Sequence, residues 1–469
     1  MQPVRAKAEL WCSSALINQI DTKNVIFALP AVTVGSFFCA MQIDKIQIRN
    51  FKGFEDIEIP FDARFNLIIG DNGSGKTSIL EALTVAMGSF FLGLKNTDAR
   101  NIREADIRLS SLERNQEFQY PVEISAFGNV MGEEISWTRT LNSSNGNTLL
   151  NRPYKIKRIA EGLDAGIRQG AEVTMPVLAY YPTGRLWKDF AERNTGDTDR
   201  KVIASRLRAY KSCLQATSTF KIFLKWFIGK EQSAIRKKEE DYSLGIVKQL
   251  IVNNLPQCKD LYYEFDEDKI QGLKVALKDG RTLPFEYLSD GARNMFALLA
   301  DIAYKCLVLN PHLKERVLAD TNGIVLIDEL DLHLHPDWQK VIVNTLKTCF
   351  PSIQFITTSH SPFLIQEMAE GQLIKLKGTQ VYISGGDQLS LEDIAETKQE
   401  VDNPQWSDKK KELYSAAVDY YDALERGKTD DRMEMKLAEL ITPFSQNPAF
   451  DAYMQQIKLI KEHNHEAGK

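Results

Sequence analysis

The chain has 469 residues, 43% of them hydrophobic, which is enough for one large core or two to three ordinary ones. Its 58 Lys and Arg against 63 Asp and Glu give a net charge of −5, which excludes nucleic-acid binding through overall positive charge. Any contact with DNA must therefore be local. The six cysteines are scattered without a Cys-x-x-Cys pair, which argues against zinc and against a disulfide framework. Reduced thiols in a cytoplasmic protein are the simplest interpretation.

Residues 1–40 are interpreted as an N-terminal extension outside the core. The apolar run 25–40 is interrupted by Pro30 and Gly35 and is too short for an ordinary membrane-spanning helix. It also begins late and has a weak basic flank, unlike a secretory signal. We therefore expect a cytoplasmic protein without membrane contact. Met41 opens a more structured passage and is a second candidate for the natural start.

A phosphate-binding loop is predicted after a buried strand. Residues 65–69 are apolar except for Asn66, residues 70–77 have the sequence Gly-Asp-Asn-Gly-Ser-Gly-Lys-Thr, and residues 78–87 have a helical pattern. Glycines are needed because successive backbone N–H groups must turn inward around phosphate oxygens. We predict that Lys76 contacts the β and γ phosphates of ATP and that Thr77 holds Mg²⁺. The other residues predicted to bind the nucleotide in this loop are Asn72, Gly73, Gly75 and Ser78.

The region between this loop and the next motif is predicted to be compact. Its helical stretches at 201–216 and 220–228 are short, several hydrophobic runs before Gly184 are typical of strands, and no sustained heptad repeat is present. Basic residues on one face of the first stretch fit either a solvated surface helix or a local DNA contact. These residues are Lys201, Arg208 and Lys211.

A second helix start with anion-binding character is predicted at residues 288–295, which have the sequence Leu-Ser-Asp-Gly-Ala-Arg-Asn-Met. Ser289 lies two residues before Gly291, at the position of a helix cap, and a helical pattern continues to residue 309. Taken alone, this segment would fit an ordinary capped helix.

Two further strands are predicted to end in polar residues. The apolar run 323–327 is followed by Asp328, predicted to support Mg²⁺, and Glu329, predicted to polarise the attacking water. Taken alone, this segment would fit a buried parallel strand with acidic residues at its end. The run 355–358 leads to His360, a candidate sensor of the γ-phosphate. An isolated histidine would more commonly be a structural residue.

The order of these segments resembles ABC-type ATPase heads, including those of SMC, Rad50 and RecF-like proteins. Residues 46–52, 331–336 and 355–362 resemble, in the same order, the opening strand, the D-loop and the switch-histidine strand of that group. The resemblance covers about residues 41–385. It implies an α/β ABC-type (SMC/RecF-like) head with a helical and β insertion lobe at about 140–285 and no long coiled coil.

Residues 386–469 are predicted to form a polar, helical tail, with an amphipathic pattern at 410–424. OLD-type ATPases join such a head to a Toprim nuclease, which needs an Asp-x-Asp pair. Because no Asp-x-Asp follows His360, we expect no nuclease site in this chain. The Q-loop glutamine of the family has two candidates, Gln116 and Gln119.

The head, residues 403–405 and the segment 180–185 (Tyr-Tyr-Pro-Thr-Gly-Arg) together resemble the ATPases of Septu-type anti-phage systems, which are also found with some retrons. Arg185 would then lie near the nucleotide or serve a structural role. The resemblance implies ATP and Mg²⁺ as cofactors and control of an HNH-type DNA nuclease partner, with DNA contacted through the complex. It also implies a homodimer or higher homo-oligomer in which Ser289 and Gly291 face a nucleotide bound by a second protomer.

Two other interpretations stay open. A RecF- or Rad50-like DNA repair ATPase would bind DNA directly and in an ATP-dependent way. A scaffold would bind the nucleotide without hydrolysing it, and the pair Asp328 and Glu329 together with His360 argues against that.

Overall fold

The computed structural model describes residues 41–426 except 96, 113–114, 145, 152–153, 185–204, 216–219, 240, 267 and 402–406, and also residues 432, 435–436 and 439–440. The extension 1–40, Arg185, Lys201 and most of the tail after residue 426 lie outside the described residues.

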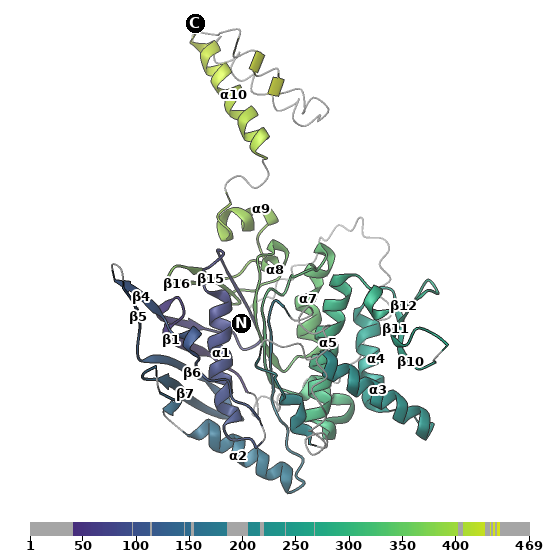
Figure 1. The fold of residues 1–469 in the computed structure, drawn as a ribbon. Coiled ribbons are helices and arrows are strands. Elements are labelled where there is room, and N and C mark those ends of the chain that lie inside the picture. The colour runs from purple at the N-terminus through teal and green to yellow at the C-terminus, as the bar shows by residue number, and fades with distance from the viewer. Residues whose placement is uncertain are drawn as a thin grey trace, which may run out of the picture.

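A six-stranded sheet forms the centre of the molecule (Figure 1), with the strand order β16-β15-β3-β14-β13-β9. All neighbouring strands are parallel except the edge pair β15 and β16. The strands β9, β13 and β14 are buried at every position, as expected for parallel strands covered on both faces. The bounds are β3 (Phe65–Gly70), β9 (Val177–Tyr181), β13 (Gly323–Ile327), β14 (Ile353–Thr358), β15 (Leu373–Lys377) and β16 (Gln380–Ser384).

Helix α1 (Lys76–Phe91) packs between the central sheet and a second, antiparallel sheet (Figure 1). Because sheets cover it on two sides, α1 is apolar over most of its circumference. The indole N–H of Trp137 in the second sheet donates to the carbonyl oxygen of Ala86 at 2.9 Å, which ties this sheet to α1. The order of the second sheet is β2-β1-β6-β7-β8, with β1 (Lys45–Phe51), β2 (Phe54–Pro60), β6 (Val122–Val130), β7 (Glu133–Leu141) and β8 (Leu149–Asn151).

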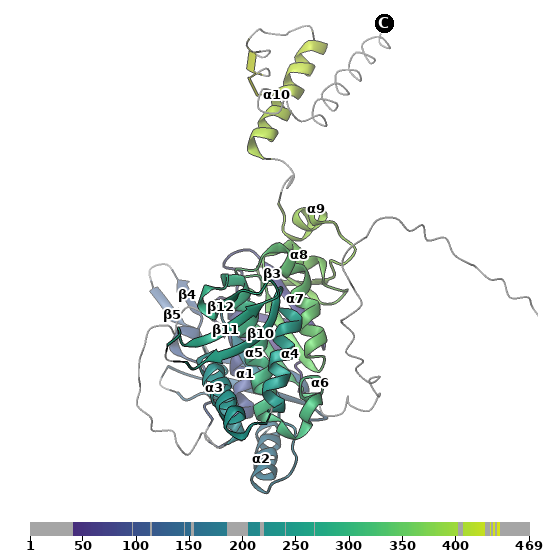
Figure 2. The same ribbon diagram turned by 90° about the vertical axis from the view of Figure 1, so that its right-hand side faces the viewer.

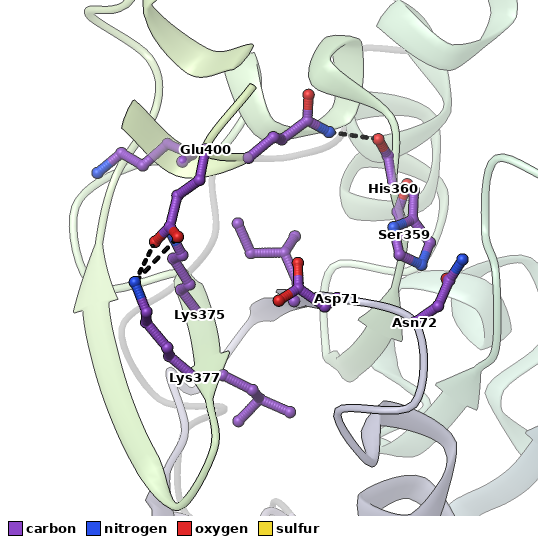
Figure 3. A pocket seen from close by; sticks show the side chains of 12 residues that line it. Asp71, Asn72, Ser359, His360, Lys375, Lys377 and Glu400 are labelled. Atoms are coloured by element: carbon purple, nitrogen blue, oxygen red, sulfur yellow. Dashed lines mark hydrogen bonds and ion pairs between the residues drawn. The ribbon is translucent and has the colours of Figure 1, made fainter. Parts of the chain in front are cut away.

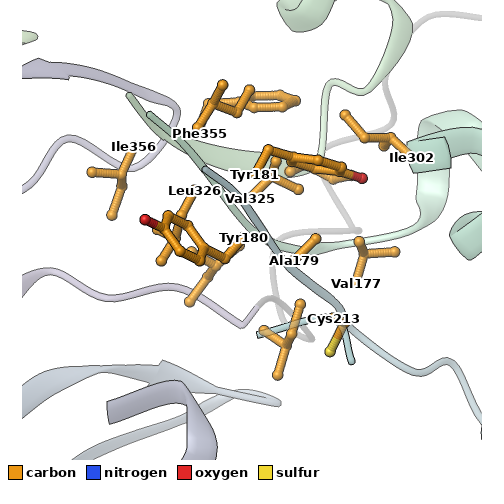
Figure 4. Packing of buried hydrophobic residues seen from close by; sticks show 14 of the residues in the cluster. Val177, Ala179, Tyr180, Tyr181, Cys213, Ile302, Val325, Leu326, Phe355 and Ile356 are labelled. Carbon is orange, nitrogen blue, oxygen red and sulfur yellow. The ribbon is translucent and has the colours of Figure 1, made fainter. Parts of the chain in front are cut away.

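Helix α5 (Asp290–Leu309) packs on β9 on the face of the central sheet away from α1 (Figure 1). Figure 4 shows the two faces at β9, where Tyr180 and Tyr181 point in opposite directions and Tyr181 lies on the side of Ile302 in α5. Helices α3 (Phe220–Lys237) and α4 (Tyr242–Asn254) contact α5 in turn, next to a small sheet (Figure 2). The small sheet consists of β10 (Cys258–Glu264), β11 (Gly272–Leu277) and β12 (Thr282–Pro284).

The fold class expected from the sequence is confirmed, since the described residues form a mixed α/β head. Helix α5, with 20 residues, is the longest helix in the described part of the chain, so this part contains no long coiled coil. The expected block 140–285 supplies both β9 in the central sheet and the elements around α3 and α4. The other described elements are α2 (Lys155–Arg168), α6 (Val317–Asp320), α7 (Pro336–Cys349), α8 (Pro362–Gln366), β4 (Leu109–Leu112), β5 (Asn115–Phe118) and the 3-10 helices Glu104–Asp106, Phe285–Tyr287 and Pro311–Arg316.

The helix predicted over 201–216 is wrong for its described part. Residues Arg206–Tyr210 form a 3-10 helix, and turns follow it. The backbone leaves the helical path because it bonds to the edge of the central sheet: the carbonyl oxygen of Cys213 accepts the N–H of Tyr180 at 2.8 Å. The hydroxyl of Tyr210 also donates to the carbonyl oxygen of Pro176 at 2.5 Å.

The described part of the tail begins with α9 (Leu391–Asp393) and a π-helical turn, η6 (Ile394–Lys398). Helix α10 (Asp408–Glu425) follows and agrees with the amphipathic pattern predicted at 410–424. Among the described helices, none combines the length and the apolar character that crossing a bilayer requires.

Candidate nucleotide-binding site

The strand order brings the predicted motifs to one edge of the central sheet. Strands β3, β14 and β13 are neighbours and run parallel, so the residues that follow them leave the sheet at the same edge. The loop 70–77 follows β3, His360 follows β14, and the two acidic residues Asp328 and Glu329 follow β13. In doubly wound sheets this edge is the usual place for a ligand.

The loop between β3 and α1 has the backbone of a phosphate cradle. Gly73 and Gly75 have φ angles of +82° and +92°, in the left-handed region that other residues disfavour. A Cβ atom at Gly75 would also lie 2.4 Å from the ring of Phe54, which packs against the loop. Helix α1 begins directly after Gly75 without a side-chain cap, so its first backbone N–H groups remain available to an anion.

Lys76 supplies a positive charge at this loop. Its ammonium donates to the carbonyl oxygens of Gly70 at 2.8 Å and Asp71 at 2.9 Å, and the residue is only 9% exposed. Burial lowers the pKa of Lys76, while attraction to Asp328, and less to Asp71 and Glu329, acts in the opposite direction. Hence the loop combines backbone donors with a cation, which is what a polyphosphate requires.

Two hydroxyls orient the carboxylate of Asp328, which is 2% exposed. Thr77 donates to one carboxylate oxygen at 2.9 Å, and Thr358 donates to the other at 2.6 Å. Thr77 and Asp328 thus bring a hydroxyl and a carboxylate together, and Mg²⁺ prefers such hard oxygen ligands. These residues therefore fit a magnesium ion.

Glu329 adopts an unusual backbone conformation next to this carboxylate. Its φ angle is +47°, which non-glycine residues rarely adopt outside functional sites and turns. The N–H of Glu329 donates to the hydroxyl oxygen of Thr358 at 2.8 Å. Thr358 therefore contacts both acidic residues at the end of β13. Sequence analysis did not single out Thr358, although a hydroxyl at the end of a neighbouring strand was a usable signal.

A cavity of about 220 Å³ lies beside the phosphate loop (Figure 3). Asp71 and Asn72 of the loop line one part of it, and Ser359 and His360 line another. His360 is exposed, as a residue that meets a ligand must be. The cavity is completed by side chains that sequence analysis did not single out and that carry no motif. They include Lys375, Lys377, Lys398, Gln399 and Glu400.

The signature-like segment lies against the D-loop-like residues 331–336. The hydroxyl of Ser289 accepts the N–H of Ala292 at 3.3 Å, and Ser289 itself is exposed. A Cβ atom at Gly291 would lie 2.5 Å from the carbonyl oxygen of His333, so this glycine permits close packing of the two segments. Ser289 thus caps α5, as predicted, and its exposed position leaves it accessible to another molecule.

Of the predicted site residues, Asn72 and His360 line this cavity and the others do not. Ser78 is half-buried in the first turn of α1. Gln116 is exposed in β5, and the side chain of Gln119 donates to the carbonyl oxygen of Glu117 at 3.2 Å. Neither glutamine is among the residues that line the cavity.

Comparison with known proteins gives matches over most of the chain. Residues 45–260 match a family model described as an AAA domain, and residues 217–366 match a second AAA-domain model, whose description adds an AbiEii toxin of a type IV toxin–antitoxin system. The Retron Ec83 probable ATPase of Escherichia coli is 25% identical over 410 residues, covering 73% of this chain and 72% of that protein. Septu protein PtuA of Bacillus thuringiensis is 26% identical over 347 residues, covering 71% and 75%. The chain is a relative of the Septu and retron ATPases.

The expected resemblance to SMC/Rad50-like ATPases is confirmed by these matches and by a further relative. The DNA double-strand break repair Rad50 ATPase of Archaeoglobus fulgidus is 30% identical over 211 residues, which cover 42% of this chain and 21% of that protein. Among solved structures, an SMC head bound to the C-terminal winged-helix domain of ScpA is 18% identical, with a TM-score of 0.45, and covers 76% of this chain and 100% of that one. By its sequence matches, the chain is an ATPase related to proteins named for anti-phage defence and for DNA repair.

Proposed function

We propose that the chain is an ATP-binding and hydrolysing regulator of an anti-phage defence system. It acts in the cytoplasm and controls an HNH-type DNA nuclease partner through ATP-dependent dimerisation of its heads. The observation that carries this proposal is the meeting of the phosphate loop, the Thr77–Asp328 pair, Glu329 and His360 at one sheet edge, in a relative of the retron and Septu ATPases.

In this proposal, the loop residues bind ATP before any chemistry occurs. The backbone N–H groups of Asn72, Gly73 and Gly75 and of the first turn of α1, which includes Ser78, contact the phosphates, and Lys76 neutralises part of their charge. Thr77 and Asp328 hold Mg²⁺, which when bound neutralises negative charge on the β and γ phosphates.

Hydrolysis then depends on the residues at the ends of β13 and β14. Glu329 orients a water molecule towards the γ-phosphate and accepts its proton, and His360 contacts the γ-phosphate. Thr358 positions Glu329 and Asp328 through the two hydrogen bonds described above.

Dimerisation uses the start of α5, where the cap residue Ser289 is exposed. Ser289 and Gly291 of one protomer face the γ-phosphate bound by the other, so two nucleotides hold two heads together until hydrolysis releases them. The tail, residues 386–469, or the lobe around α3 and α4 serves as the docking surface for the nuclease.

The test is to purify the chain together with the product of the adjacent gene, which the proposal expects to be an HNH nuclease, and to measure complex formation and DNA cleavage with and without ATP. We expect a stable complex whose cleavage activity changes with ATP.

Lys76→Ala removes this ATP dependence because it loses ATP binding. Glu329→Gln keeps ATP binding and lowers turnover by about a hundredfold or more. Wild-type turnover in Glu329→Gln would remove the assigned role of that carboxylate. The matched control is Glu133→Gln, which makes the same change at an exposed residue of β7.

A second candidate function is direct action on DNA as a RecF- or Rad50-like repair ATPase, which the Rad50 match favours. It requires ATP-dependent DNA binding by the purified chain alone. A mobility shift with short DNA duplexes, with and without ATP, separates the two functions, since the regulator needs its partner to act on DNA.

A further inference from the structure

The first residues of the C-terminal tail lie on the nucleotide-binding edge of the head. We call residues 394–400 the latch segment; it consists of η6 and the two residues that follow it. The side-chain amide of Gln399 donates to the backbone carbonyl oxygen of His360 at 2.6 Å (Figure 3). The tail therefore contacts the backbone of the residue proposed to sense the γ-phosphate.

A charged contact fastens the same segment to the central sheet. The carboxylate of Glu400 accepts hydrogen bonds from Lys375 at 2.7 Å and Lys377 at 2.9 Å, both in β15 (Figure 3). These two ammonium groups lower the pKa of Glu400 to about 2, so its carboxylate is ionised at any physiological pH. Lys398 adds a hydrogen bond to the hydroxyl of Ser384 in β16 at 2.9 Å.

The strand that receives Glu400 also touches the phosphate loop. Strand β15 pairs with β3, and a Cβ atom at Gly70 would lie 2.8 Å from the carbonyl oxygen of Leu376. Asp71 of the loop and Glu400 of the latch segment line the same cavity of about 220 Å³. The latch segment thus borders the phosphate loop through β15 and the switch histidine through Gln399.

We propose that the latch segment and ATP oppose each other: the fastened segment holds the start of the tail at the nucleotide-binding edge, and ATP binding releases it. This inference rests on the proposed function, because it assumes that ATP occupies the phosphate loop. The two fastenings of the latch segment lie beside groups assigned to ATP, because Gln399 bonds to the backbone of His360 and Glu400 lines the same cavity as Asp71 of the phosphate loop. The carboxylate of Glu400 also adds negative charge to this cavity, which disfavours nearby phosphates.

The proposal has a thermodynamic consequence. If ATP favours the released segment, then a closed segment must oppose ATP by the same coupling free energy. The side chain of Glu400 is 47% exposed, so each of its ion pairs contributes modestly. Removing its charge should therefore tighten ATP binding by roughly twofold to fivefold.

The experiment combines hydrogen exchange with equilibrium ATP binding on the full-length chain. It uses a Glu329→Gln background, so that ATP stays intact. We expect ATP to accelerate amide exchange in residues 394–400. Glu400→Gln and Gln399→Ala should show fast exchange there without ATP and tighter ATP binding. Glu396→Gln makes the same change of charge at an exposed position of η6 and should behave like the parent.

Two results would overturn the latch. One is a rate of amide exchange in residues 394–400 that ATP does not change, in a sample in which ATP binding is detected. The other is an ATP affinity in Glu400→Gln and Gln399→Ala equal to that of Glu396→Gln. If the parent binds no ATP at all, the proposed function fails first and the latch fails with it.

Discussion

At the scale of single residues, Thr358 connects the two acidic residues of the candidate site. Its hydroxyl donates to Asp328 and accepts the N–H of Glu329, so one oxygen atom joins the proposed magnesium ligand to the proposed catalytic carboxylate. The residue whose N–H it accepts, Glu329, has a left-handed backbone conformation. Such a hydroxyl acts through other residues, and it is therefore a positioning residue.

We predict that Thr358→Val lowers the kcat of ATP hydrolysis by about tenfold to a hundredfold, since a hydrogen bond to a charged group contributes about 1.5–3 kcal/mol. Steady-state ATP turnover and equilibrium ATP binding measure the effect. Thr357→Val is the matched control, because the Thr357 hydroxyl is equally buried but donates to the carbonyl oxygen of Asn66 at 3.0 Å, away from the acidic pair. An equal loss of kcat in both variants would show that Thr358 has only a structural role.

At the scale of elements, the start of α5 and the D-loop-like segment can pack as closely as they do because residue 291 is a glycine. A Cβ atom at Gly291 would lie 2.5 Å from the carbonyl oxygen of His333, a distance that real Cβ contacts do not show. The side chain of Asn294, one turn later, donates to the carbonyl oxygen of Leu332 at 3.2 Å. The two elements must therefore move together.

Gly291→Ala is expected to lower the free energy of unfolding by about 1–3 kcal/mol, because the added methyl group forces the two backbones apart. ATP turnover should fall with it, since the shifted D-loop-like segment begins two residues after Glu329. Gly245→Ala in α4 is the control: its Cβ would meet nothing within 4 Å, and alanine should stabilise that helix by about 0.5–1 kcal/mol. Denaturant unfolding of both variants checks the opposite signs, and a neutral Gly291→Ala would contradict the packing argument.

At the scale of the whole molecule, the proposed mechanism requires two copies of the chain. Ser289 caps its own helix and is exposed, whereas the phosphate loop lies at the edge formed by β3, β14 and β13. In the proposed dimer, Ser289 and Gly291 of each copy complete the nucleotide-binding site of the other copy.

We expect Glu329→Gln to change from the mass of one chain to that of two when ATP and Mg²⁺ are added, as measured by light scattering after size exclusion. The double variant Glu329→Gln with Ser289→Arg should still bind ATP but keep the smaller mass, because a long cationic side chain blocks the facing surface. The same protein without ATP is the control. A double variant that dimerises with ATP as the parent does would exclude Ser289 from the interface.

The phosphate loop and the two strands at 323–327 and 355–358 could be predicted from the sequence because their signals are local. A glycine-rich loop between a strand and a helix needs only neighbouring residues, and fully buried parallel strands are continuous apolar runs. The family resemblance added the fold class, and the described α/β elements confirmed it. The roles of Lys76, Asp328 and the other site residues remain predictions.

Other features depended on which strands become neighbours, and no local pattern carries that information. The order β3-β14-β13 brings Thr358 of β14 to Asp328 and Glu329, which follow β13. The pairing of β15 with β3 brings Lys375 and Lys377 to the phosphate loop. Residues Arg206–Tyr210 form a 3-10 helix instead of the expected α-helix, because the backbone of the same segment bonds to the edge strand β9. Tertiary hydrogen bonds overrode local helix propensity, which is a weak preference by comparison.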